Sequence, residues 1–170
     1  DTRQHRSDQA CGRESDIGPA CAAVADPERT LLGAEQERWL ARGFRESSAR
    51  WDVLAQQVIL APFNIAPEAP DGLFNLDQWD GYTAARRRLY DALHAGKVEN
   101  PVVITGDIHA SAVFDLLDAG RAGGPAVPIG TELVGPSITS PFPEAFVPLV
   151  EAAASRNPGA RYLEGRKHGY

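Results

Sequence analysis

The spacing of apolar residues changes along the chain and predicts alternating helices and strands. Apolar positions recur every three to four residues over 33–48, 80–93 and 144–154, which predicts three amphipathic helices. Continuous or alternating apolar runs predict strands over 51–60, 102–105, 111–117 and 127–134, with an extended tail near Tyr162. Residues 1–30 and 64–77 are rich in Gly and Pro and are expected to be irregular. This order of elements predicts an α/β layered fold with a mixed sheet.

The same pattern predicts which side chains are buried. The first helix should turn Leu32, Trp39, Leu40 and Phe44 toward the core. Together with Trp39, three more aromatic residues are expected to be core or loop anchors: Trp51, Trp79 and Tyr82. The run Val102–Thr105 is typical of a central strand that is buried on both faces.

The pattern also predicts the roles of two charged residues near the second helix. Asp80 stands where it can cap the start of that helix. Arg86 lies on an otherwise apolar helix face, so it should pair with a buried carboxylate, for which Asp77, Asp80 and Glu132 are the candidates.

Composition limits the class of protein. The chain has 170 residues, a formal charge of −6, 43% hydrophobic and 24% charged residues, which suits one soluble domain or a piece of a larger one. The absence of a basic cluster argues against nucleic-acid or anionic-membrane partners, and no apolar run approaches the ~20 residues of a membrane span. Because the sequence contains no methionine, we expect it to begin inside a longer protein, with residues 1–30 as a linker segment before a domain over 31–170.

The two cysteines leave two possibilities open. Cys11 and Cys21 lie in the irregular segment, where they can form one disulfide of an exported protein or remain two unpaired thiols.

The segment Gly106-Asp107-Ile108-His109 is the strongest candidate for chemistry. In extended chain, residues two apart project to the same side, so Asp107 and His109 can face one site at the carboxyl end of a buried strand. A carboxylate with an imidazole suits one or two metal cations. The alternative is a turn with a capping Asp and an exposed His.

Arg3 and Arg6 are a second candidate site. Their guanidinium groups suit a phosphate group, or else serve as structural ion-pair partners.

Seven segments in order give the sequence a specific resemblance. They are Asp1-Thr2-Arg3-Gln4-His5-Arg6-Ser7-Asp8-Gln9; Leu32-Gly33-Ala34-Glu35-Gln36 with Trp39-Leu40; Trp51 leading to Ala55-Gln56-Gln57-Val58; Asp77-Gln78-Trp79-Asp80-Gly81-Tyr82 followed by Arg86; Gly106-Asp107-Ile108-His109; Thr131-Glu132-Leu133-Val134-Gly135 with Ser137-Ile138-Thr139-Ser140; and Gly169-Tyr170. In these segments the chain resembles the alkaline phosphatase D family of metallophosphoesterases. His5 stands where that family usually has Tyr.

The resemblance implies a four-layer α/β/β/α sandwich, of which this chain would supply the C-terminal half, truncated at both ends. It implies hydrolysis of phosphate monoesters and often diesters by two metal ions, typically iron with calcium, in a protein exported by the twin-arginine route through a signal outside this chain. Asp107 and His109 would be metal ligands, one on each ion, and the remaining ligands would precede Asp1. The alternatives are a catalytically inactive fragment and a non-catalytic α/β binding domain.

Overall fold

The computed structural model describes residues 1–12, 15–120 and 123–169. The helical elements are α1 (Ala34–Glu46), α2 (Thr83–Ala95) and α3 (Val147–Ala154), with short 3-10 helices η1 (Ala22–Ala25), η2 (Trp79–Gly81) and η3 (Glu144–Phe146). The strands are β1 (Ile17–Gly18), β2 (Asp52–Ala55), β3 (Phe74–Asn75), β4 (Pro101–Thr105), β5 (Ser111–Asp118), β6 (Val127–Val134) and β7 (Ala160–Glu164).

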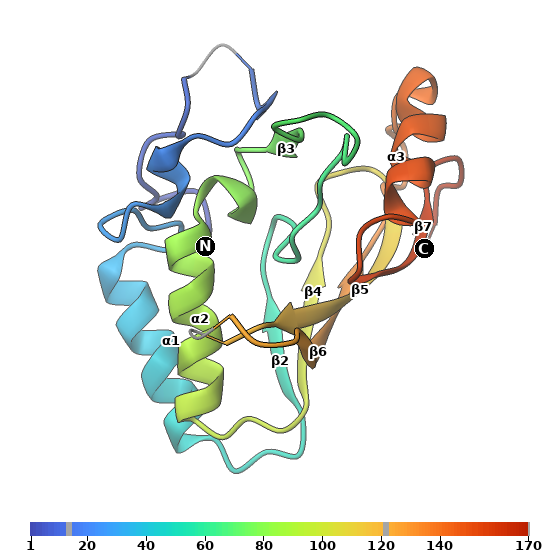
Figure 1. Ribbon diagram of the computed structural model, residues 1–170. Helices are drawn as coiled ribbons and strands as arrows, with labels where there is room; N and C mark the ends of the chain where they lie inside the picture. The colour runs from blue at the N-terminus through green and yellow to red at the C-terminus, as the bar shows by residue number, and fades with distance from the viewer. Residues whose placement is uncertain (13–14, 121–122, 170) are drawn as a thin grey trace.

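A mixed sheet with strand order β2-β4-β6-β5-β7 organises the protein. Strands β2, β4 and β6 are parallel, whereas β5 runs antiparallel to both β6 and β7. Helices α1 and α2 lie together on one side of the sheet, and α3 packs beside β7 (Figure 1). The core between α2 and the sheet contains Leu89, Leu93, Val103, Phe114 and Leu116. The predicted α/β fold with a mixed sheet is therefore confirmed.

The sheet face opposite α1 and α2 carries an apolar row that is partly open to solvent. Strand pairing aligns Ile104, Leu133, Val113 and Tyr162 across β4, β6, β5 and β7. Ile104 and Leu133 are each 43% exposed and Tyr162 is 51% exposed. The expectation that Val102–Thr105 is buried on both faces is therefore wrong, because Ile104 projects from β4 onto this open face of the sheet.

The run 51–60 does not form one long strand. Strand β2 ends at Ala55, although Val58, Ile59 and Leu60 are fully or almost fully buried. The backbone N–H groups of Leu60 and Ala61 donate to the Glu132 carboxylate, at 2.8 and 2.7 Å, instead of to a neighbouring strand. A side chain thus satisfies these buried donors.

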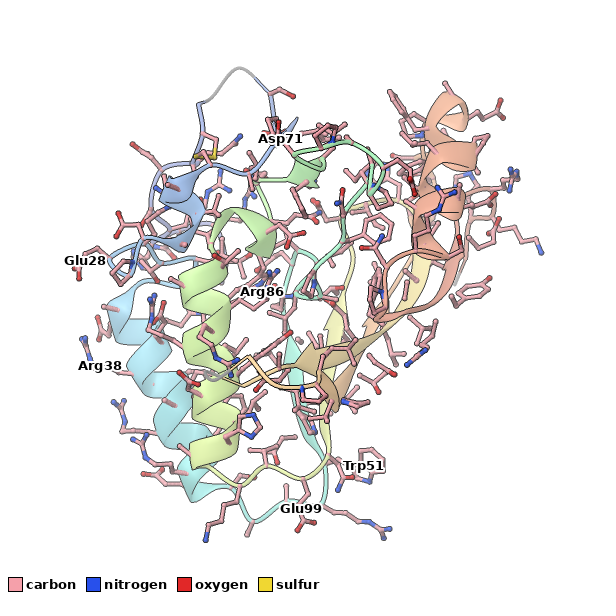
Figure 2. All side chains as sticks on the ribbon, viewed as in Figure 1. Glu28, Arg38, Trp51, Asp71, Arg86 and Glu99 are labelled. Atoms are coloured by element: carbon pink, nitrogen blue, oxygen red, sulfur yellow. A yellow bond between two sulfur atoms is a disulfide. The ribbon has the colours of Figure 1, made fainter. Side chains whose placement is uncertain are left out.

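The structure also corrects several side-chain expectations. Trp79 and Tyr82 are buried as expected, but Trp39 and Trp51 are exposed, and Trp51 lies at the periphery in Figure 2. Trp39 directly precedes Leu40, and a step of one residue turns it about 100° away from the inner face of α1.

Asp80 does not cap α2. Its carboxylate accepts hydrogen bonds from the Phe63 N–H at 3.0 Å and from Arg86 at 2.6 Å. Arg86 extends between α2 and the sheet (Figure 2), so Asp80 is its partner among the three candidates.

The segments expected to be irregular meet in a short antiparallel pairing. Ile17 pairs with Asn75 and Gly18 with Phe74.

A disulfide joins Cys11 to Cys21, which decides between the two possibilities left by the sequence. Within the described ranges, no helix is long and apolar enough to cross a membrane.

Candidate functional site

Asp107 and His109 both lie on the loop that follows β4, at its carboxyl end. Both residues are exposed, while Ile108 between them is half-buried. The loop is not extended as the sequence argument assumed, because Asp107 and His109 have φ angles of 76° and 60°. Non-glycine residues in this left-handed region carry a conformational cost and concentrate at functional sites. The strand therefore presents a carboxylate and an imidazole to solvent on a strained loop.

Two glutamines hold this loop in place. Gln78 is 5% exposed and its amide Nε2 donates to the Asp107 Oδ2 at 3.1 Å. The Gln57 carbonyl accepts the N–H of Gly106 at 3.3 Å, directly before Asp107. The Gln57 side chain in turn accepts two hydrogen bonds from buried Thr2, from its N–H and its hydroxyl. The amino-terminal segment is thereby attached to the Asp107 loop.

Arg3 and Arg6 share one carboxylate beside this loop. Arg3 donates to Oδ2 and Arg6 to Oδ1 of Asp77, each at 2.5 Å. Burial opposes ionisation of Asp77, but the hydrogen bonds from both arginines outweigh it and hold the pKa of Asp77 below its usual value. Asp77 precedes Gln78, so the two arginines and Asp107 are connected through consecutive residues.

The charges of this region are coupled. The hydrogen bond to Asp77 raises the pKa of the Arg3 guanidinium, partly offset by burial, and the charge of Asp107 raises it further. The Arg3 side chain is 46% exposed. Arg3 and Arg6 also line a surface hollow of about 310 Å³. The pair therefore has a structural partner and still borders open space.

The loop after β6 meets the same edge of the sheet. The N–H of Gly135 donates to the Thr105 carbonyl at 2.9 Å, and the Pro141 carbonyl lies 3.4 Å from His109 Nδ1. The carboxyl-terminal tail folds back, because His168 Nδ1 lies 3.5 Å from the hydroxyl of Ser137.

The donor set of the Asp107 loop has the chemistry of a metal site. A carboxylate oxygen and an imidazole nitrogen are suitable ligands for di- or trivalent cations. Gln78 is hydrogen-bonded to one oxygen of Asp107, an outer contact of the kind that orients ligating carboxylates. In the part of the chain that the structure describes, no group of three or more His, Cys, Asp or Glu side chains is arranged to hold an ion. Asp107 and His109 are thus suitable ligand types, and the described residues bring no third donor of these kinds to them.

Gln57 and Gln78 were not singled out as functional by the residue pattern. A signal was present for Gln57, since Gln56-Gln57 interrupts an otherwise apolar run. Polar side chains inside a buried segment must find partners, but the run does not show that the partners are Thr2 and the Asp107 loop.

By its fold and its candidate site, the chain is a mixed α/β protein that places a carboxylate and an imidazole at the carboxyl end of a parallel strand. The family model for PhoD-like phosphatase matches residues 1–170, and the chain belongs to this family. It is 41% identical over 141 residues to alkaline phosphatase D of Bacillus subtilis (strain 168), covering 82% of this chain and 23% of that protein. A solved structure described as the structure of PhoD matches 99% of this chain and 32% of its own length, with a TM-score of 0.80 and 31% identity. The chain therefore spans less than a third of each of these relatives.

Proposed function

We propose that this protein takes part in metal-dependent hydrolysis of phosphate esters, with Asp107 and His109 as ligands of a two-metal centre. The observation that carries the proposal is the placement of both side chains, exposed on one strained loop at the carboxyl end of β4. The family supports phosphoesterase chemistry. Two bound ions, which we propose to be iron and calcium, would supply an activated water and neutralise charge on the phosphoryl group.

The chain's own residues have distinct proposed roles. Asp107 and His109 each bind one ion, and Gln78 holds the Asp107 carboxylate in one orientation through its 3.1 Å hydrogen bond. Arg3 and Arg6 bind phosphate oxygens, because guanidinium groups match the spacing of those oxygens. Their shared contact with Asp77 fixes the two guanidinium groups beside the Asp107 loop.

A two-metal centre needs more ligands than these two. We infer that further ligands come from segments outside the described residues, and that the chain is the C-terminal part of the catalytic domain. The exposed apolar row of Ile104, Leu133 and Tyr162 supports this inference, because a further layer would bury it.

We also propose that the protein works outside the cytoplasm after twin-arginine export. The disulfide between Cys11 and Cys21 supports this location, because disulfides persist in oxidising compartments.

The proposal predicts that Asp107→Asn and His109→Ala each lower turnover of p-nitrophenyl phosphate by about 100-fold or more in the protein that contains this chain. Metal content, measured by elemental mass spectrometry, should fall in both variants while circular dichroism stays unchanged. Asp71→Asn is the matched control, because Asp71 is exposed on the loop before β3. Activity within threefold of wild type in both variants would refute the ligand assignment.

A further inference from the structure

An apolar pocket of about 230 Å³ lies next to the Asp107 loop. Its walls come from the segment after β2, from β5, from β7 and from the η3–α3 region. The apolar side chains that carry the argument are Phe63, Ile108, Phe142, Phe146 and Leu163. Asn75 and Gln78 are the polar residues of the lining. A concave apolar site with few polar groups is the usual form of a small-molecule site.

Three residues of the pocket lining adjoin the proposed metal ligands in the chain or in space. Ile108 lines the pocket and stands between Asp107 and His109 in the chain. Gln78 lines the pocket and donates to Asp107 at 3.1 Å. Phe142 lines it directly after Pro141, whose carbonyl lies 3.4 Å from His109 Nδ1. The pocket and the ligand loop therefore share walls.

We propose that this pocket binds the apolar organic group of a phosphate ester whose phosphoryl group lies at Asp107 and His109. The inference rests on the proposed function and specifies its substrate class as esters of aryl or medium-chain alkyl alcohols. An apolar cavity of about 150 Å³ binds benzene, so 230 Å³ admits an aryl ring or a chain of about six carbons. A charged or strongly polar alcohol group would lose hydration there without enough partners.

The proposal predicts a dependence on chain length. Burial of one methylene contributes about 0.8 kcal/mol, which is about a fourfold gain in affinity per carbon until the pocket is filled. The probes are non-hydrolysable methyl-, butyl-, hexyl-, octyl- and phenylphosphonate, titrated calorimetrically into the metal-loaded protein. Hexyl- and phenylphosphonate should bind at least 30-fold more tightly than methylphosphonate, with little further gain for octyl. Within the alkyl series, whose alcohols are similar leaving groups, the kcat/KM values for the corresponding phosphate esters should follow the same order.

Two neighbouring apolar residues provide a matched pair of variants. Phe146 lines the pocket and is 55% exposed, so Phe146→Ser removes an apolar wall without opening the core. Leu149 is 42% exposed on α3 and does not belong to the lining. Phe146→Ser should reduce the phenyl-over-methyl preference by about tenfold, whereas Leu149→Ser should leave it within twofold.

The outcomes separate the pocket from the proposed function. Hydrolysis of esters with equal binding of methyl- and phenylphosphonate would overturn the pocket assignment and leave the phosphoesterase proposal intact. A preference that Phe146→Ser does not change would place the apolar subsite elsewhere and also overturn it. A preference that depends on Phe146, in a protein that hydrolyses no ester, would refute the proposed function and the substrate role together.

Discussion

Glu132 offers a quantitative test of how burial controls a carboxylate in this fold. The side chain is fully buried on β6, with Oε1 accepting from the Leu60 N–H at 2.8 Å and the Thr105 hydroxyl at 3.1 Å, and Oε2 accepting from the Ala61 N–H at 2.7 Å. Burial outweighs these three hydrogen bonds and raises the pKa of Glu132 from 4.5 to about 7. The folded protein thus binds a proton that the unfolded chain releases.

The consequence is a loss of stability as pH rises. Between pH 4.5 and about 7 the folded state holds more protons than the unfolded state, so the free energy of unfolding falls across this window and levels off above it. At about 1.4 kcal/mol per pKa unit, the total contribution is about 3 kcal/mol. Glu132→Gln is neutral at every pH and removes this slope. The poorer fit of its amide shifts the whole curve without changing the slope.

The assay is urea unfolding followed by tryptophan fluorescence at pH 4.5, 5.5, 6.5 and 7.5. The stability of wild type minus that of Glu132→Gln should fall by about 3 kcal/mol over this range. Glu68→Gln is the control, because the Glu68 side chain is 75% exposed, and its curve should parallel that of wild type. Wild-type and Glu132→Gln curves that stay parallel within about 0.5 kcal/mol would refute the reasoning.

Two further predictions concern stability. A Cβ on Gly81 would lie 1.9 Å from the Leu76 carbonyl oxygen, so Gly81→Ala should cost about 3 kcal/mol or more; Gly43→Ala, in open space on α1, should instead add about 0.5–1 kcal/mol. Thermal unfolding decides both, and equal midpoints would contradict the clash argument. Asp118 is 5% exposed and accepts a hydrogen bond from Arg87 at 2.9 Å that depresses its pKa, so Asp118→Asn should cost about 2 kcal/mol at pH 7. That cost should shrink as pH falls below 3.8, and a cost independent of pH would contradict the ion-pair argument.

The sequence by itself determined the elements whose signal is local. Alternation along 111–117 and periodicity along 80–93 predicted a strand and a helix, which the structure has as β5 (Ser111–Asp118) and α2 (Thr83–Ala95), because side-chain direction follows from backbone geometry over a few residues. The same reasoning placed Asp107 and His109 directly after a strand, which is β4.

Only the tertiary structure decided features that depend on distant residues. The continuous apolar run Val102–Ile104 reads alike whether one or both of its faces are covered, yet Ile104 is exposed. Arg6 and Asp77 are 71 residues apart, and the Glu132 carboxylate accepts from the backbone N–H of Leu60, 72 residues away, in a run that the sequence predicted to be strand. Periodicity carries no information on such partners, because they are set by the packing of the sheet and its connections. The orientation of the Asp107 carboxylate depends on the hydrogen bond from Gln78. It is therefore a property of the folded protein, which the segment Gly106-Asp107-Ile108-His109 does not specify by itself.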